Sequence, residues 1–315
     1  MLALCIESSH ARGMGHLFRA LNLADGLRER GLQPIFLLNA HTPAQDLLAK
    51  RGYAHEVVPL GDHNGWEGDV IERHGVRLWI NDRLNTDAYH ARQVKALGLP
   101  LVTFDDRGEG AALSDLNVAA LVFDAIGKLQ GQRILQGPDY LILDPEIARF
   151  QRLRKRVDSL LVTLGGSDTY GVTVGVVRHL AAAGRSATVI VGPAFAHLAA
   201  LEQALTPAFE LKIGVPSLIA EFSRHDLAIT GGGVTPFEAA ASGLPCVVVA
   251  NEHFEVPVGQ VLAGLGVAAF AGHHETLDWR VLSAALPIES MSRAGLERVG
   301  LQGRQRVLDV IATYL

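Results

Sequence analysis

Three glycine-rich turns carry the residues of this chain whose types and spacing suit chemistry. The longest reads Gly231-Gly232-Gly233-Val234-Thr235-Pro236-Phe237-Glu238, between an apolar run typical of a buried strand and an alanine-rich run typical of a helix. Glycine lets the backbone approach a ligand closely, and the start of a helix presents free N–H groups and a partial positive charge. This turn is therefore predicted to bind an anion.

The residue types after the glycines predict how this helix begins. Thr235 is predicted as the N-cap, Pro236 suits the first helical position, and Glu238 completes a Thr-x-x-Glu capping box. Two roles are open for Glu238. It closes the capping box, or its carboxylate accepts hydrogen bonds from a ribose diol.

The other two turns lie near the start and the middle of the chain. Gly13-Met14-Gly15-His16 is half of a dinucleotide-binding fingerprint, but bulky Phe18 stands where the third glycine belongs, so a nicotinamide cofactor is not expected. The positive end of a helix disfavours a second proton on His16 and leaves it able to act as a base. The alternative is that His16 only caps the helix. Gly165-Gly166-Ser167-Asp168 follows a second predicted buried strand.

Alternating strands and helices must position these turns. Short apolar runs alternate with helical patterns through both halves, which predicts an α/β fold of two doubly wound, Rossmann-like domains. We expect domains at 1–148 and 149–315, with C-terminal helices that return to the first domain. Ligands of such sheets bind beyond the carboxyl ends of the strands, so a cleft between two facing domains is expected. The charged stretch 146–158 is expected to be a solvated helix or linker.

Composition limits the classes of function. The chain has 315 residues and a net charge of −5, with no basic stripe interleaved with aromatic residues, so nucleic acid is not an expected partner. Cys5 and Cys246 both lie in predicted buried strands, which indicates a reducing compartment and no disulfide framework. Neither is in a CxxC pair, so no structural metal site is expected. There is no signal-peptide pattern and no apolar run long enough to span a membrane, so a cytoplasmic protein is expected.

The three motifs together resemble one group of proteins. They are Gly-x-Gly-His-x-x-Arg at Gly13 to Arg19, Leu164-Gly165-Gly166-Ser167-Asp168, and Gly-Gly-x-Thr-x-x-Glu closed by Gly243-Leu244-Pro245. In this order they resemble the UDP-sugar hydrolases of pseudaminic acid biosynthesis and the related spore-coat polysaccharide proteins, which are relatives of the MurG-type glycosyltransferases with the GT-B fold. The resemblance covers nearly the whole chain.

The resemblance implies a reaction. In that family the histidine matching His16 activates water, which attacks the anomeric carbon of a UDP-linked acetamido- or diacetamido-trideoxy sugar, and UDP leaves with inversion. The glycine turns hold the diphosphate, the glutamate matching Glu238 binds the ribose, and backbone at 213–219 binds uracil. No cofactor and no metal are implied. The catalytic residues expected are His16 and Asp82. The substrate-binding residues expected are Gly13, Gly15, Arg19, Arg83, Gly166, Ser167, Val215, Ile219, Gly232, Gly233, Val234, Thr235, Glu238 and Asn251.

Some positions depart from the family pattern. Arg83 stands where an aromatic residue is frequent, and it either pairs with a phosphate or substrate carboxylate or is a surface residue. Asp82 orients the substrate, orients His16, or caps a strand end. Asn251 is kept, but Glu252 replaces a glutamine, which leaves the sugar open. Asp105 and Asp106 are expected to line the N-terminal side of the cleft rather than bind a metal.

Two other functions remain open at this stage. A GT-B glycosyltransferase would use the same donor site but transfer the sugar to an acceptor. A non-catalytic nucleotide-sugar binding protein would keep the fold without turnover, and the presence of His16 and both glycine turns argues against it.

Overall fold

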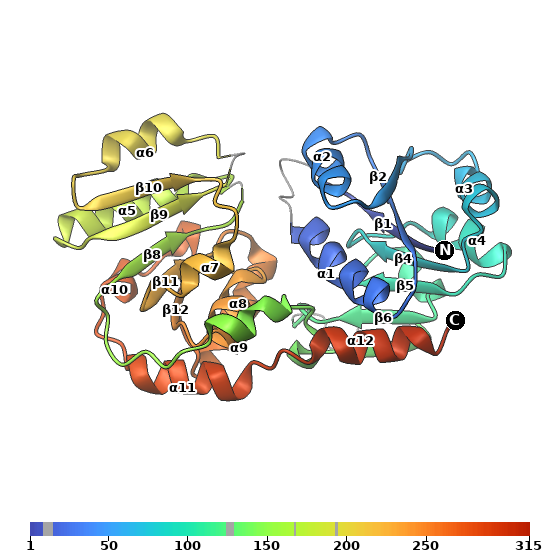
Figure 1. Cartoon of the computed structure of the whole chain (residues 1–315). Helices are drawn as coiled ribbons and strands as arrows, with labels where there is room; N and C mark the ends of the chain where they lie inside the picture. Colours follow the sequence, from blue (N-terminus) through green and yellow to red (C-terminus); the bar gives the residue numbers. More distant parts are fainter. Residues whose placement is uncertain (9–14, 124–128, 167, 193–194) are drawn as a thin grey trace. The chain divides into compact units, whose positions relative to one another are not determined.

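The chain folds into two compact α/β units. The computed structural model describes residues 1–8, 15–123, 129–166, 168–192 and 195–315. One unit comprises Met1–Leu143 together with Gln302–Leu315, and the other comprises Asp144–Leu301. The last helix, α12 (Gly303–Ala312), therefore belongs to the first unit, where it packs on α1 (Figure 1).

The first unit is a parallel sheet that has the order β3-β2-β1-β4-β5-β6-β7 within the described residues. Leu17 and Leu21 of α1 and Val307 of α12 pack on one face of this sheet, and Trp66 of α3 and Val94 of α4 pack on the other. Its elements are β1 (Leu2–Ile6), α1 (Gly15–Glu29), β2 (Pro34–Leu38), α2 (Thr42–Lys50), β3 (Ala54–Val57), α3 (Trp66–His74), β4 (Leu78–Asp82), α4 (Ala88–Ala96), β5 (Leu101–Phe104), η1 (Glu109–Leu113), β6 (Leu116–Ala119), β7 (Arg133–Gln136), η2 (Pro138–Tyr140) and α12.

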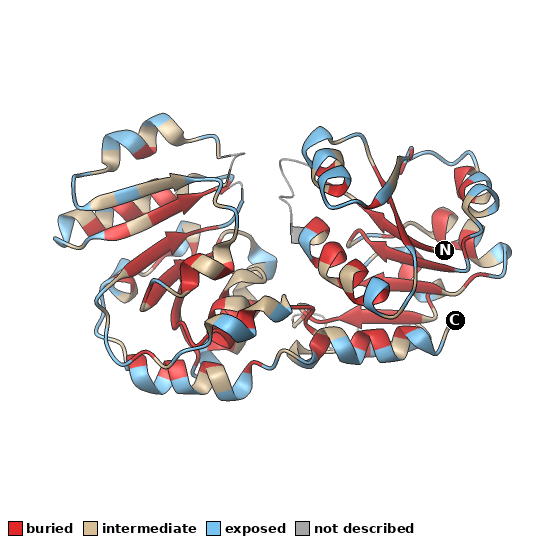
Figure 2. Ribbon diagram, in the orientation of Figure 1, coloured by how far each residue is buried: buried red, intermediate tan, exposed pale blue. Residues whose placement is uncertain are grey.

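The second unit repeats this design with a parallel sheet ordered β10-β9-β8-β11-β12-β13 among the described residues. Its central strands are fully buried and read as continuous apolar runs, as parallel strands covered on both faces do (Figure 2). Its elements are η3 (Pro145–Phe150), β8 (Leu160–Thr163), α5 (Val172–Ala182), β9 (Ala187–Val191), α6 (Leu198–Ala204), β10 (Phe209–Ile213), α7 (Leu218–Phe222), β11 (Leu227–Thr230), α8 (Thr235–Ala241), β12 (Cys246–Ala250), η4 (His253–Glu255), α9 (Val256–Gly264), β13 (Ala268–His273), η5 (His274–Thr276), α10 (Trp279–Leu282) and α11 (Ile288–Arg298).

The predicted fold class is confirmed, since both sheets are parallel and doubly wound. One strand was not predicted and one local prediction was wrong. Strand β7 has no clear strand pattern, because two of its four residues are charged or amide side chains at the edge of the sheet. The charged stretch 146–158 is not solvated throughout, because Arg154 is only 1% exposed. Its guanidinium donates to the carbonyls of Phe222, His225 and Ser242, and so binds the ends of α7 and α8.

No helix among the described residues has both the length and the apolar character needed to cross a bilayer.

Candidate functional site: two half-sites at the strand switch points

The first half-site lies where the strand order of the first unit reverses. β1 and β4 are adjacent and parallel, and the chain leaves them in opposite directions along the sheet. Such a switch point is where doubly wound sheets bind ligands. Asp82 is the last residue of β4 and pairs in register with Ile6 at the end of β1. His16 lies in the first turn of α1, the helix that follows β1.

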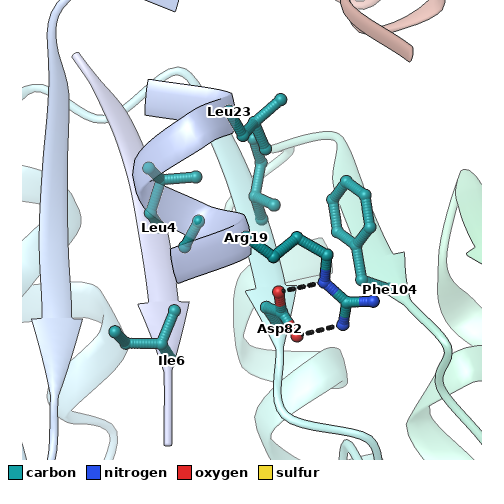
Figure 3. Close-up of a pocket in the computed structure, with 8 residues that line it drawn as sticks. Leu4, Ile6, Arg19, Leu23, Asp82 and Phe104 are labelled. Atoms are coloured by element: carbon teal, nitrogen blue, oxygen red, sulfur yellow. Dashed lines mark hydrogen bonds and ion pairs between the residues drawn. The ribbon is translucent and has the colours of Figure 1, made fainter. Parts of the chain in front are cut away.

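His16, Arg19 and Asp82 form a hydrogen-bonded group at this point. Nδ1 of His16 lies 2.5 Å from Oδ1 of Asp82. Arg19 binds the same carboxylate twice, from Nε to Oδ2 at 2.7 Å and from Nη2 to Oδ1 at 2.5 Å (Figure 3). Because His16 and Arg19 are three residues apart on one helix, both side chains face the strand end. The sequence left three roles open for Asp82, and the geometry is that of a residue that orients His16.

Arg19 has a second acidic partner in Asp105, which follows β5. Asp105 also accepts a hydrogen bond from the backbone N–H of Leu121 at 2.9 Å. The guanidinium lies near the Phe104 ring, 5.4 Å from its centroid, and the two line a small, largely apolar pocket that is too tight for a water molecule (Figure 3). A buried cation held by two carboxylates and an aromatic face has little freedom to move.

The charges of this group are strongly coupled. Burial opposes ionisation of Asp82, but the charge of Arg19 and the hydrogen bonds from Arg19 and His16 outweigh it and hold the pKa of Asp82 well below its usual range. Burial likewise opposes protonation of Arg19, and the charges of Asp82 and Asp105 outweigh it and raise the pKa of the guanidinium. Both groups are therefore ionised at neutral pH.

An ionised Asp82 determines the state of His16. A carboxylate only accepts hydrogen bonds, so Nδ1 of a neutral His16 carries the proton. Nε2 is then the unprotonated nitrogen, and no hydrogen bond to it is found within the described part of the chain. His16 is partly exposed, with 14% of its side chain accessible. This arrangement gives a ring fixed in orientation and tautomer, with a free basic nitrogen.

Arg83 and Asp106 do not join this group. Arg83 is 7% exposed and so is not a surface residue, and its Nη2 donates to the carbonyl of Leu60 at 3.1 Å. Its guanidinium also lies beside Cys5, which faces the side of the sheet away from α1. Asp106 accepts from the N–H groups of Thr86 and Gly108 instead. Asp105 and Asp106 thus have different hydrogen-bond partners.

The second half-site lies at the equivalent switch point between β8 and β11. Gly165 follows β8 with a φ of +103°, a conformation that side-chain-bearing residues rarely adopt. The next described side chain, Asp168, accepts hydrogen bonds from the N–H groups of Val172 and Thr173 at 2.9 and 2.8 Å. The resemblance implies that Gly166 and Ser167 in this turn hold a diphosphate. The N–H groups of Val172 and Thr173 are not free for an anion, because Asp168 accepts their hydrogen bonds.

The triple-glycine turn after β11 leads into α8. The predicted capping box is absent: Val234 is the N-cap residue, Thr235 is the first residue of the helix, and no side chain caps it. The reason is that Val234 already has helical φ and ψ, so Thr235 has passed the capping position. The backbone N–H groups of Gly233, Val234 and Thr235 have no hydrogen-bond partner among the described residues. These groups remain available to an anion.

Glu238 is half-buried in the first turn of α8 and, since it closes no capping box, its carboxylate has no hydrogen-bond partner in the described part of the chain. Burial, together with the nearby charge of Asp144, raises the pKa of Glu238 to about 7. A carboxyl held in this way gains from any partner that donates hydrogen bonds to it.

Glu255 reaches the glycine turn from the loop after β12. Its Oε2 accepts hydrogen bonds from the N–H groups of Gly232 at 3.3 Å and Asn251 at 2.7 Å. A Cβ on Gly232 would lie 2.6 Å from the Cβ of Glu255, so only glycine fits there. Nδ2 of Asn251 donates to the carbonyl of Leu164 at 3.0 Å, which ties β12 to the end of β8, while its Oδ1 is buried without a partner in the described chain.

The chain was compared with known protein families, curated proteins and solved structures. No protein-family model matches the chain. It is 24% identical to the spore coat polysaccharide biosynthesis protein SpsG of Bacillus subtilis, over 97% of this chain and 96% of that protein. Its fold matches that of MurG from Acinetobacter baumannii with a TM-score of 0.70 and 14% identity, over 99% of this chain and 100% of MurG. The chain is SpsG-like and has the GT-B fold.

A further structure of the same fold contains a nucleotide sugar. UGT2 of Phytolacca americana, in complex with UDP-2-fluoro-glucose and pterostilbene, matches with a TM-score of 0.58 and 12% identity, over 100% of this chain and 94% of UGT2. At this identity the likeness shows the fold alone.

Several of the predicted site residues lie together within one unit. His16, Arg19 and Asp82 meet in the first unit, while Gly232, Gly233, Val234 and Thr235 form one turn in the second, with Glu238 one helical turn beyond them. Val215, half-buried, and Ile219, buried, lie between β10 and α8 around the start of α7. Gly15 begins α1, and Gly166 lies exposed in the turn after β8. Gly13 and Ser167 lie outside the described residues.

Two residues contact the candidate site in ways that were not predicted. Asp105 was expected to line the N-terminal side of the cleft, and no role was predicted for Glu255. Asp105 was detectable, because it follows the strand next to β4 and therefore emerges at the same sheet edge as Asp82. No sequence signal indicated that Glu255 folds back onto Gly232.

Proposed function

We propose that the chain is a nucleotide-sugar hydrolase that releases UDP from a UDP-linked acetamido- or diacetamido-trideoxy sugar for surface polysaccharide or nonulosonic acid synthesis. The observation that carries the proposal is the His16–Asp82 hydrogen bond, which fixes the ring and leaves Nε2 free to accept a proton. The likeness to SpsG, whose name assigns it to spore coat polysaccharide biosynthesis, supports the pathway.

In the proposed reaction, His16 acts as the general base. Nε2 takes a proton from water as the water oxygen attacks the anomeric carbon. The bond from that carbon to the β-phosphate oxygen breaks, UDP leaves with the electron pair, and the sugar is released as the inverted hemiacetal. Asp82 stabilises the imidazolium that forms, because its carboxylate is already ionised and in contact with Nδ1.

The second unit is proposed to bind the leaving group. The N–H groups of Gly233, Val234 and Thr235 are free to receive the diphosphate at the start of α8. Glu238 is proposed to accept hydrogen bonds from the ribose hydroxyls, and the segment with Val215 and Ile219 to contact the base. Gly13, Gly15, Gly166, Ser167, Arg83 and Asn251 remain proposed substrate contacts.

A GT-B glycosyltransferase is the second candidate. It shares the fold that this chain has in common with MurG and UGT2, and it would use the same donor site. In that case His16 would activate a hydroxyl of an acceptor instead of water. The proposed binding of the nucleotide by the second unit would be the same.

The test is turnover in H₂¹⁸O without any acceptor. Purified protein is incubated with a panel of UDP- and CMP-linked amino sugars, and the products are read by mass spectrometry, with the His16→Asn variant as control. The proposal expects release of UDP and ¹⁸O on the anomeric carbon, lost in the variant. Turnover only after an acceptor is added would establish the transferase, and binding of UDP-sugars without turnover in either case would indicate a non-catalytic binding protein.

A further inference from the structure

Three metal-ligating side chains meet at one edge of the second unit, outside both half-sites. His253 begins η4 after β12, His273 ends β13, and Glu275 lies in η5. β12 and β13 are adjacent and parallel, with Ala250 in register with His273, so the two loops leave the sheet side by side. One nitrogen of each histidine and one oxygen of Glu275 all lie within 4.8 Å of one another.

The two imidazole rings lie face to face. The rings of His253 and His273 stack with their centroids 4.2 Å apart and their planes 7° apart, so the exposed His253 must rotate before both rings can bind one ion. Nδ1 of His273 accepts the backbone N–H of Glu275 at 3.4 Å, which makes it the unprotonated nitrogen, and an ion bound at Nδ1 would replace this long contact. A metal ion needs an unprotonated imidazole nitrogen.

The spacing suits a small tetrahedral ion. Nδ1 of His273 lies 3.6 Å from Oε2 of Glu275. Two ligands of a tetrahedral zinc ion, each about 2.0–2.1 Å from the metal, are about 3.3–3.4 Å apart. His253 and Glu275 are both exposed, so rotation of their side chains can close the remaining gap without disturbing the core. Two histidines and a carboxylate favour zinc-class ions over magnesium or calcium, which prefer oxygen ligands.

We propose that His253, His273 and Glu275 form a binding site for a divalent zinc-class ion. The site is separate from the proposed hydrolysis, which uses no metal. Its test measures ion binding and does not depend on the outcome of the turnover experiment. Two further rings pack next to the site. The ring of His274 contacts that of His273 with centroids 4.4 Å apart, and the ring of Tyr170 stacks on that of His274 with centroids 4.3 Å apart. Three protein ligands leave a coordination position for water or another small ligand.

The proposal also has a structural consequence. His253 and Glu255 lie in the same short turn, η4, and Glu255 accepts the N–H of Gly232. An ion bound to His253 and His273 would therefore restrain the turn that holds Glu255 on the triple-glycine loop. Proteolysis within 251–255 is expected to slow when the ion is added.

The test uses Co²⁺ as a spectroscopic probe with the full chain, after removal of any histidine tag. We expect one equivalent of Co²⁺ to give the visible absorption of a nitrogen- and oxygen-ligated ion, displaced by Zn²⁺. His253→Ala and Glu275→Ala, both exposed positions, should each weaken binding by roughly tenfold or more, because each removes one of three ligands. His63→Ala, an exposed histidine of the other unit, should bind like the unaltered chain.

Two results would overturn the proposal. One is the absence of a saturable Co²⁺ spectrum in the unaltered chain. The other is binding that is equally strong in His253→Ala, Glu275→Ala and His63→Ala, which would place the ion elsewhere. His273→Ala is read only if its circular dichroism matches that of the unaltered chain, since His273 ends a strand.

Discussion

In the first unit the two central strands lead to charged and polar side chains, whereas in the second unit the equivalent strands lead into glycine turns. Both sheets have the same strand order, so the ends of β1 and β4 correspond to the ends of β8 and β11. In the first unit Asp82 ends β4, and His16 and Arg19 lie on α1, the helix after β1; in the second unit Gly165 follows β8 and Gly231 to Gly233 follow β11. One topology thus presents side chains in one unit and bare backbone in the other.

Under the proposed function, this difference is a division of labour between the two units. Proton transfer requires a titratable side chain with a fixed orientation. The buried Arg19–Asp82 pair fixes the orientation of His16. Stabilising a leaving diphosphate requires several N–H groups close to the ligand, which glycine and a helix start supply without side chains. The predictions below test this division, from the largest expected effect to the smallest.

Replacing Asp82 should abolish most activity without abolishing nucleotide binding. In Asp82→Asn the amide no longer fixes Nδ1–H of His16 or stabilises an imidazolium, so kcat is expected to fall by roughly 10²- to 10⁴-fold. Steady-state kinetics with the substrate found in the H₂¹⁸O experiment measure this. Asp62→Asn, an exposed aspartate of the same unit, is the matched control. A loss of less than tenfold would show that Asp82 does not orient the base.

Replacing Arg19 should destabilise the fold. Arg19→Met leaves Asp82 and Asp105 buried without their cation, so the free energy of unfolding should drop by about 3–5 kcal/mol. Urea denaturation measures it, and Arg30→Met is the control because its partner Asp309 is largely exposed, so a change below about 1 kcal/mol is expected. Equal effects of the two variants would contradict the coupled network.

The depressed pKa of Asp82 gives this network a pH dependence. Asp82 is ionised in the folded chain at a pH where the unfolded chain is protonated, so its stabilisation is complete above about pH 4 and is lost as the pH falls further. The difference in unfolding free energy between the unaltered chain and Arg19→Met should therefore shrink in acid. A constant difference down to pH 2 would argue against an ionised Asp82.

Glu238 should give the opposite dependence in the second unit. With a pKa of about 7, the folded carboxyl keeps a proton that the unfolded chain loses near pH 4, so stability falls as the pH rises between these values. Glu238→Gln removes this loss and should be more stable than the unaltered chain by about 1–3 kcal/mol at pH 8 and equally stable below pH 4. Thermal unfolding at a series of pH values measures this. If the unfolding free energies of the two proteins differ by the same amount at every pH, the pKa of Glu238 is not raised by folding.

Thr235 should matter for binding and little for stability. Because its side chain caps no helix, Thr235→Ala should change the unfolding free energy by less than about 0.5 kcal/mol, whereas loss of a capping threonine costs about 1 kcal/mol. Asp168→Ala, which does remove a cap, is the comparison. If Thr235→Ala binds UDP more weakly and Asp168→Ala does not, the Thr235 side chain contacts the diphosphate.

Much of the fold was predictable because its signals are local. The apolar runs of β1, β2 and β12 and the glycine turns after β8 and β11 follow from residue type, and their order predicts the doubly wound sheets. The position of His16 at the start of α1 was predictable in the same way. The glycine turns and His16 together indicated the two half-sites.

The remaining features depend on contacts between distant residues. The Arg19–Asp105 pair joins residues 86 positions apart, and Glu255 meets Gly232 over 23 positions. Arg154 lies in a run of charges that is typical of a solvated segment, yet its guanidinium donates hydrogen bonds to four backbone carbonyls of the second unit. The absent capping box depended on the φ and ψ of Val234, which the residue types do not determine.

The most direct test of the division of labour is to measure UDP affinity and turnover in two variants, His16→Asn and Glu238→Ala. Isothermal titration with UDP gives the first quantity, and release of UDP from the substrate gives the second. The account predicts that His16→Asn binds UDP like the unaltered chain but loses turnover, and that Glu238→Ala binds UDP more weakly. Unchanged turnover in His16→Asn, or unchanged UDP affinity in Glu238→Ala, would contradict it.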